Sequence, residues 1–136
     1  MKKIGNLSTR EEELLNILWA YNEPLTQNEM VDRLVSQGWN NVTLFKTVQS
    51  LAKAGYLKVV GLEKSVKTYA RKFIPSLTKE EFYSELLIKK GMTSDSLPDI
   101  TAALIGANKK ENTEQKREVI AKLEEIIESL RKEIQE

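Results

Sequence analysis

Two short helical patterns lie between residues 26 and 55 of the chain, and only about three or four residues separate them. Each pattern begins with a capping residue, Thr26 in the first and Asn41 or Asn40 in the second, and each ends at a glycine. In the second pattern the apolar side chains that recur at helical spacing are Leu44, Val48 and Leu51. Two short helices joined so tightly, the second opened by a cap, are typical of a helix-turn-helix.

A further helical pattern precedes this pair, and a hairpin pattern follows it. Ser8 and Glu11 form a capping box for the preceding helix. Residues 56–60 are rich in β-forming side chains, residues 61–65 favour a turn, and residues 66–74 resume extended character. Three helices followed by a basic hairpin are the parts of a winged helix. We therefore expect a mainly α chain with a small β wing.

The residues after Pro75 are predicted to form more helices. A capping pattern recurs at Thr78 and Glu81, a short helix follows residues 94–96, and a long terminal helix begins at Thr113. The apolar stripe of that last helix spans about 15 residues, just over two heptads, which is too short for an independent coiled coil. Helical faces in so small a region are difficult to bury within one chain.

A second copy of the chain would cover these apolar faces. We therefore predict a winged-helix domain over residues 1–75 and a helical dimerisation domain over residues 76–136. The alternative is that the last helices fold back onto their own winged helix. The residues expected to form the dimer interface are Phe82, Leu86, Leu97, Ile100, Leu104, Val119, Leu123, Ile126, Ile127 and Leu130.

The basic residues are concentrated in one part of a chain whose net charge is only +1. Residues 40–75 contain seven Lys or Arg against Glu63 alone, a net charge of +6, whereas residues 76–136 contain ten basic and thirteen acidic residues, a net charge of −3. An anionic partner is therefore expected for the first part only. The alternative is that the cations of the hairpin only keep it soluble and protect its edges.

Two absences argue against catalysis. Without cysteine the chain has no disulfide, thiolate nucleophile or zinc–thiolate site, and without histidine it has no imidazole base or ligand. We expect neither an enzyme nor a bound metal or cofactor. No apolar run is long enough for a signal peptide or a membrane span, so we expect a cytoplasmic protein.

The second helix of the pair is predicted to contact DNA. With its apolar stripe in the core, the residues on the opposite side, at 100° per residue, are Val42, Lys46, Gln49 and Lys53. Lys and Gln pair with guanine and adenine edges, and Val contacts thymine methyl groups, so this face suits a major groove. Asn41 and Thr43 lie at the helix N-terminus, where side chains and free N–H groups meet phosphate. The alternative is an ordinary solvated helix face.

Phe45 counts against a merely solvated face, because an aromatic ring on the outward flank is better explained by a partner or by the edge of the core. Trp39 precedes the cap and is expected to anchor the core rather than to stack on a base. The residues expected to contact DNA, including those of the wing, are Asn41, Val42, Thr43, Phe45, Lys46, Thr47, Gln49, Ser50, Lys53, Lys64, Lys67 and Arg71.

Several stretches of the chain also match a known family in order and spacing. They are Leu7-Ser8, EEELLNILW at residues 11–19, Leu25-Thr26, Glu29, Trp39, Thr43, Leu51, Lys53, Gly55, Leu57, Tyr69, Pro75 and residues 78–82. On these residues the chain resembles the penicillinase-repressor family (BlaI/MecI, with the copper-responsive CopY repressors) over about residues 5–105. The resemblance implies a homodimeric repressor whose winged helices bind palindromic operators, with Thr43, its outward neighbours and the wing at the DNA.

The chain departs from this family at positions that bear on function. Asn40-Asn41 stands where the family usually has a Ser-Pro-like start, Ser50 stands where Arg is common, and Val66-Lys67 replaces a Gly-Arg pair in the wing. The base preference is therefore expected to differ from that of the best-known members. Residues 97–105 contain no Asn-Phe bond, at which the family's antibiotic sensors are cleaved, and the C-terminal cysteine pairs of the copper-responsive branch are absent. The inducing signal thus stays open.

The sequence favours a sequence-specific DNA-binding transcriptional repressor that acts as a homodimer on a palindromic operator in double-stranded DNA. The alternative function is a winged-helix protein–protein interaction module within a larger assembly. Salt-sensitive binding to duplex DNA separates the two hypotheses.

Overall fold

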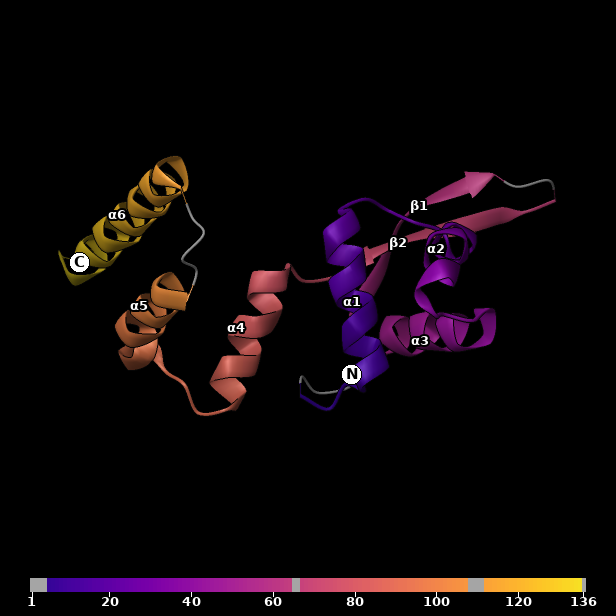
Figure 1. Cartoon of the computed structure of the whole chain (residues 1–136), viewed down its shortest axis with the longest axis horizontal. Coiled ribbons are helices and arrows are strands. Elements are labelled where there is room, and N and C mark those ends of the chain that lie inside the picture. Colours follow the sequence, from indigo (N-terminus) through magenta and orange to yellow (C-terminus); the bar gives the residue numbers. More distant parts are fainter. Residues whose placement is uncertain (1–4, 65–66, 108–111, 136) are drawn as a thin grey trace. The chain divides into compact units, whose positions relative to one another are not determined.

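The computed structural model describes residues 5–64, 67–107 and 112–135, and the chain divides into two compact units, Met1–Met92 and Thr93–Glu136. The elements of the first unit are α1 (Thr9–Tyr21), α2 (Gln27–Leu34), the 3-10 helix η1 (Val35–Gln37), α3 (Asn41–Lys53), β1 (Leu57–Lys64), β2 (Tyr69–Pro75) and α4 (Lys79–Lys89). Three helices followed by an antiparallel hairpin form a winged helix (Figure 1). The predicted fold class, mainly α with a small β wing, is confirmed.

Local hydrogen bonds fix where the helices begin. Capping boxes start α1, α2 and α4: in each, the hydroxyl of the cap accepts a backbone N–H and a Glu carboxylate accepts the N–H of the cap. Helix α3 uses a different cap, because Oδ1 of Asn40 accepts the N–H of Thr43 at 2.8 Å. Of the two predicted caps the structure therefore has Asn40, and Asn41 is the first residue of the helix.

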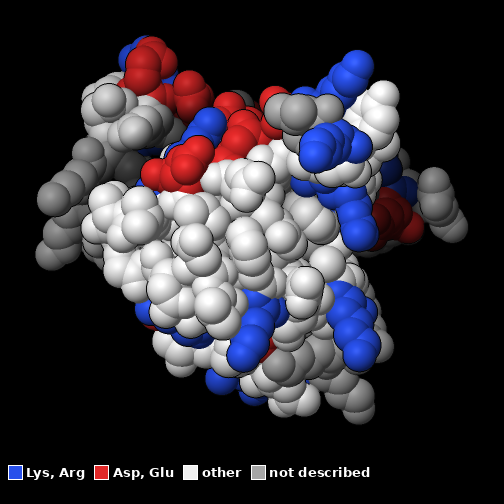
Figure 2. All heavy atoms as spheres, turned by 90° about the vertical axis from the view of Figure 1, so that its right-hand side faces the viewer, with Lys and Arg blue, Asp and Glu red and all other residues white. Residues whose placement is uncertain are grey.

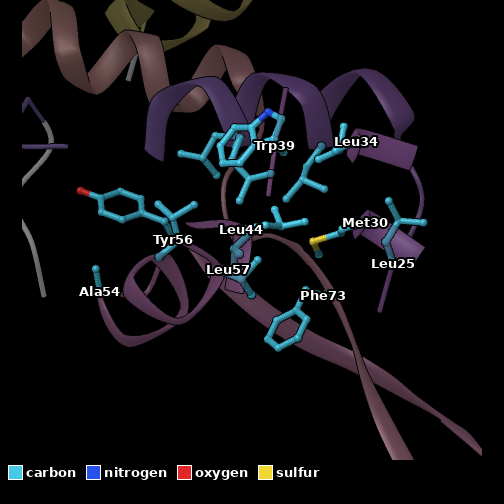
Figure 3. Packing of buried hydrophobic residues seen from close by; sticks show 14 of the residues in the cluster. Leu25, Met30, Leu34, Trp39, Leu44, Ala54, Tyr56, Leu57 and Phe73 are labelled. Atoms are coloured by element: carbon cyan, nitrogen blue, oxygen red, sulfur yellow. The ribbon is translucent and has the colours of Figure 1, made fainter. Parts of the chain in front are cut away.

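The core of the first unit lies between its helices and the base of the hairpin (Figure 3). Its buried side chains are Leu14, Leu15, Leu18, Leu25, Met30, Leu34, Trp39, Leu44, Val48, Leu51, Ala54, Tyr56, Leu57, Phe73 and Phe82. The predicted stripe of α3 is thus buried, which confirms the orientation of that helix. Trp39 is buried as expected, and the guanidinium of Arg10 lies 4.2 Å from the centre of its ring.

The hairpin is longer than the sequence predicts. Antiparallel pairs run from Leu57 with Pro75 to Lys64 with Tyr69, and an irregularity between Val59 and Gly61 shifts the register. Residues 61–64, which were expected to turn, continue β1 because their pairing with β2 persists beyond this shift. Residues 65 and 66 lie outside the described residues. The wing therefore extends past the core, beyond α2 and α3 (Figure 1).

Helix α4 packs against the winged helix. The Phe82 ring is 2% exposed and lies 5.4 Å from the Trp19 ring and 6.0 Å from the Tyr56 ring. The Tyr83 hydroxyl donates to Oε1 of Glu12 at 2.9 Å and accepts from Nδ2 of Asn16 at 3.0 Å. The prediction of Phe82 as a dimer-interface residue is therefore wrong, because its own chain covers the ring.

The division between the two units also differs from the expected boundary. It falls after Met92 rather than after Pro75, because the contacts of α4 tie residues 79–89 to α1. The second unit contains the 3-10 helix η2 (Ser94–Ser96), α5 (Leu97–Ala107) and α6 (Thr113–Gln135). Neither α5 nor α6 has a buried residue. Among the described residues, no helix is both long and apolar enough to span a membrane.

Candidate nucleic-acid interface

Helix α3 presents one exposed row of side chains opposite its buried stripe. Val42 is 63% exposed, and Lys46, Gln49 and Lys53 are exposed as well. This row combines two cations, an amide with both donor and acceptor groups, and a branched aliphatic side chain. The structure therefore brings together the residues that the helical spacing placed on the outer face.

The N-terminal turn of α3 lies at one end of this row. Asn41 is exposed and Thr43 is half-buried. The N–H of Thr43 is taken by Asn40, whereas the first backbone N–H groups of a helix have no partner within the helix itself. The helix dipole adds partial positive charge at this end, which makes it suitable for a phosphate.

Two predicted contact residues form hydrogen bonds within the protein. Thr47 is 7% exposed, and its Oγ1 donates to the carbonyl of Thr43 at 2.7 Å. Ser50 is half-buried, and its Oγ donates to Oε2 of Glu11 on α1 at 2.9 Å. Both side chains bond within the protein. The burial of Thr47 argues against direct DNA contact, whereas Ser50 is half-buried like Thr43 and its contact with DNA stays a prediction.

Phe45 lies in a cleft between α3, the start of α2 and strand β2. The cleft has a volume of about 480 Å³, and its lining residues are Thr26, Gln27, Asn28, Phe45, Val48, Gln49, Ala52, Ala70, Arg71 and Phe73. Phe45 is half-buried, so its ring covers the edge of the core as well as facing this opening. Gln49 and Arg71, one from the helix and one from the wing, face the same cleft.

The wing contributes the remaining cations. Lys64, Lys67 and Arg71 are all exposed, and Arg71 pairs with Leu62 across the hairpin. Lys72 is a further basic residue, which was not among the residues expected from the sequence to contact DNA. It is half-buried and lies near enough to Glu29 that its charge helps to lower the pKa of that carboxylate.

The main cause of that lowered pKa is the backbone N–H of Thr26, which hydrogen-bonds the Glu29 carboxylate. The positive charge of Lys72 and Arg33 acts in the same direction. Glu29 therefore keeps its negative charge beside the start of α2, and it partly compensates the cations at the base of the wing.

The charge distribution of this end of the protein separates cations from an uncharged area. In Figure 2, Lys and Arg side chains lie to the right of and below a broad area without charge, and Asp and Glu side chains lie along its upper margin. Phosphate contacts orient a protein on DNA, whereas uncharged polar and apolar groups contact the base edges. Cations at the rim with a neutral centre can therefore serve both tasks at once.

The hairpin also exposes apolar side chains that were not among the residues expected from the sequence to contact DNA. Leu62 is 62% and Tyr69 is 61% exposed, and Val59 and Val60 are each 44% exposed. Alternation along the strands predicts that one face of a two-stranded hairpin is open. The apolar content of β1, and the aromatic residue that begins β2, were the signals that could have identified these residues.

The remaining residues predicted for a dimer interface fall in both units. Leu86, Ile100, Val119 and Leu123 are half-buried, and Leu97, Leu104, Ile126, Ile127 and Leu130 are between 48% and 66% exposed. Ile120 and Ile134, which the set omitted, are exposed as well. Their role at an interface stays a prediction.

Within the described ranges, no group of three or more His, Cys, Asp or Glu side chains is placed to hold a metal ion.

No protein-family model matches the chain, and no curated protein matches it. Among solved structures it is similar to Staphylococcus aureus MarR in complex with salicylate and kanamycin, with 19% sequence identity, a TM-score of 0.44, and coverage of 95% of this chain and 77% of that chain. A likeness of this degree transfers no function. The assignment as a winged helix rests on the elements and the core of this chain itself.

Proposed function

We propose that the protein is a DNA-binding transcriptional regulator, and more narrowly a sequence-specific repressor that acts as a homodimer on a palindromic operator. The observation that carries the proposal is the exposed row on α3, Val42, Lys46, Gln49 and Lys53, on the same unit as a cationic wing. If the outer face of α3 were only solvated, the cationic wing on the same unit would be unexplained. If the cations of the wing only kept the hairpin soluble, the exposed row on α3 would be unexplained.

Helix α3 would enter the major groove with this row toward the base edges. A Gln amide forms paired hydrogen bonds with adenine, and Lys donates to guanine or phosphate. The wing cations Lys64, Lys67 and Arg71 would contact phosphates beside the groove and set the position of α3 along the duplex. Asn41 and Thr43 would meet the backbone at the N-terminus of the helix.

The homodimer belongs to the proposal because a palindrome needs two reading helices. Two α3 helices in successive major grooves would lie about one turn of DNA apart. The apolar side chains of α5 and α6, exposed in a single chain, are the groups that a second copy would cover. The resemblance to the penicillinase-repressor family supports this arrangement and gives no inducer for this chain.

Selection of bound sequences from a random duplex pool, followed by binding titrations at several salt concentrations, tests this function. We expect a two-fold symmetric consensus and an affinity that falls steeply with salt. Enrichment of no sequence, or duplex binding that does not respond to salt, would contradict the proposal.

The exposed apolar side chains of the wing favour a second candidate, a protein–protein interaction module. Leu62 and Tyr69 are each more than 60% exposed, which is more apolar surface than phosphate contact requires. This candidate predicts a partner protein whose binding is abolished by Leu62→Ser and Tyr69→Ser. Loss of salt-sensitive DNA binding in the same variants would instead assign these side chains to the DNA interface.

A further inference from the structure

Two kinds of contact hold α3 in the first unit. On one side Leu44, Val48 and Leu51 are buried in the core, and such apolar contacts have no strong directional preference. On the adjoining flank, the Ser50 hydroxyl donates to Oε2 of Glu11 across 2.9 Å. A hydrogen bond weakens steeply at unfavourable angles, so this second contact adds a directional restraint on the rotation of α3 to the packing of the apolar stripe.

The acceptor of this bond is itself held in place. Glu11 is only 4% exposed, its Oε1 accepts the N–H of Ser8 at 2.9 Å, and its own N–H donates to the Ser8 hydroxyl at 3.1 Å. The carboxylate thus belongs to the capping box of α1 and bridges from there to α3. Ser50 is bonded to a group whose orientation is already set.

The position of Ser50 along α3 makes this bond important for the exposed row. Gln49 is its neighbour in sequence, and Lys46 and Lys53 lie about one turn away on either side. Side chains end about 5 to 6 Å from a helix axis, so a rotation of about 20° would move them by about 2 Å. Hydrogen bonds to base edges do not tolerate such a displacement.

We propose that Ser50 is a positioning residue for DNA recognition: its bond to Glu11 sets the rotation of α3 about its own axis, and thereby the placement of Lys46, Gln49 and Lys53. The proposal rests on the proposed function of α3 as the DNA-reading helix. Ser50 would act through its bond to Glu11, and phosphate contacts by the wing would not depend on that bond. Removal of the bond should therefore weaken recognition of the operator sequence while leaving the general affinity for duplex DNA nearly unchanged.

The experiment compares the full-length wild type with Ser50→Ala, Ser50→Thr and the control Ser84→Ala, an exposed serine on α4. Affinity is measured for the selected operator and for an unrelated duplex. In Ser50→Ala we expect about a tenfold loss of operator affinity, the size of effect that the loss of a hydrogen bond to a charged group produces. Affinity for the unrelated duplex should change by less than about twofold. Ser50→Thr keeps the hydroxyl and should restore discrimination, and Ser84→Ala should match the wild type.

Ser50→Cys serves as a second variant in case the alanine variant unfolds, because a thiol is close in volume but donates weakly. Hydrogen exchange of the same proteins without DNA gives an independent measurement. Exchange should accelerate in α3 of Ser50→Ala relative to α2, and Ser50→Thr should reverse the effect. Equal losses on both duplexes, unchanged discrimination, or unchanged exchange in α3 would each overturn the positioning role. Absence of salt-sensitive DNA binding by the wild type would instead refute the proposed function, while the exchange result still decides whether Ser50 holds α3.

Discussion

At the scale of single residues, the proposed function gives different tasks to two groups of exposed polar side chains in the first unit. Lys67 and Arg71 stand on the wing, where a long flexible cation reaches phosphate without a fixed geometry. Gln49 stands on a helix whose opposite face is buried, so its side chain leaves the helix in a defined direction. In the proposed function, the first group would supply attraction to any duplex and the second would supply discrimination between sequences.

The double substitution Lys67→Ala with Arg71→Ala should weaken binding to operator and unrelated DNA alike. Each lost phosphate contact lowers the slope of log affinity against log salt by about 0.9, so we expect the slope to fall by about 2. Filter binding or fluorescence anisotropy at salt concentrations between about 50 and 200 mM measures this slope. The control, Lys79→Ala with Lys90→Ala, removes the same charge from the first residue and the C-cap of α4 and should leave the slope nearly unchanged. A selective loss on the operator alone would place the wing cations at base edges.

Sequence periodicity placed most residues of α3 on their correct side but did not identify the hydrogen-bond partners of Thr47 and Ser50. The stripe of Leu44, Val48 and Leu51 fixes the rotation of the helix to within one residue. It cannot show that α1 passes beside the flank, because Glu11 lies 39 positions away from Ser50 in the chain. Thr47 lies next to the stripe, and its bond to the Thr43 carbonyl satisfies the hydroxyl without solvent. At the border of a helix face, tertiary contacts therefore determine whether a side chain bonds within the protein, and periodicity alone cannot predict this.

At the scale of elements, capping boxes set the starts of α1, α2 and α4, and they could be predicted because every partner lies within three residues. The box of α2 also carries a charge. The backbone N–H of Thr26 lowers the pKa of the Glu29 carboxylate below the ordinary value of 4.5. A lowered pKa in the folded state means that the ionised carboxylate stabilises the fold. This contribution is present above pH 4.5 and is lost as the pH falls through the lower folded-state pKa.

Glu29→Gln should therefore lower the free energy of unfolding near neutral pH and converge with the wild type in acid. Gln retains an acceptor for the N–H of Thr26, so the comparison isolates the charge. Urea unfolding followed by tryptophan fluorescence at intervals between pH 6 and pH 3 measures the difference. Glu118→Gln on α6 is the control and should show no such convergence. A difference that stays constant with pH would mean that the charge of Glu29 contributes nothing to folding.

Helix α4 could be predicted as a helix, but its partner could not. The capping pattern at Thr78 and Glu81 and the aromatic residue after it fit a dimerisation helix and a core helix equally well. The packing of Phe82 on Trp19 and Tyr56 connects segments far apart in the chain, which no local pattern encodes. The structure thus adds a fourth helix to the core of the winged helix.

Phe82→Ala should destabilise the first unit by about 3 to 5 kcal/mol, because a buried aromatic ring leaves a cavity that the surroundings fill only in part. Leu87→Ala on the same helix removes a side chain that is 37% exposed and should cost distinctly less. Chemical unfolding of both variants gives the comparison. Equal, small effects would show that α4 is not part of the cooperative core.

At the scale of the whole molecule, the two units differ in how completely they bury their own apolar surface. The first has a core of buried side chains, whereas α5 and α6 have no buried residue. Ile126, Ile127 and Leu130 are each about half exposed, at 48%, 48% and 49%. Their spacing of mainly three and four residues places them on one stripe of α6. Sequence patterning identifies this stripe but cannot identify what covers it, because the covering group need not belong to the same chain.

If a second copy covers the stripe, Leu123→Asp with Ile127→Asp should convert a dimer into a monomer, since each change would bury an unpaired carboxylate at the interface. Sedimentation velocity of the full-length protein measures the mass. Ala121→Asp adds a carboxylate to an exposed position on the other side of α6 and should leave the dimer intact.

The monomeric variant should also lose most of its affinity for the palindrome while binding a single half-site as the wild type does, because only the dimer couples two α3 helices across one turn of DNA. A dimer that survives both aspartates would exclude α6 from the main interface, and a monomer with undiminished operator affinity would contradict recognition of a palindrome by two copies.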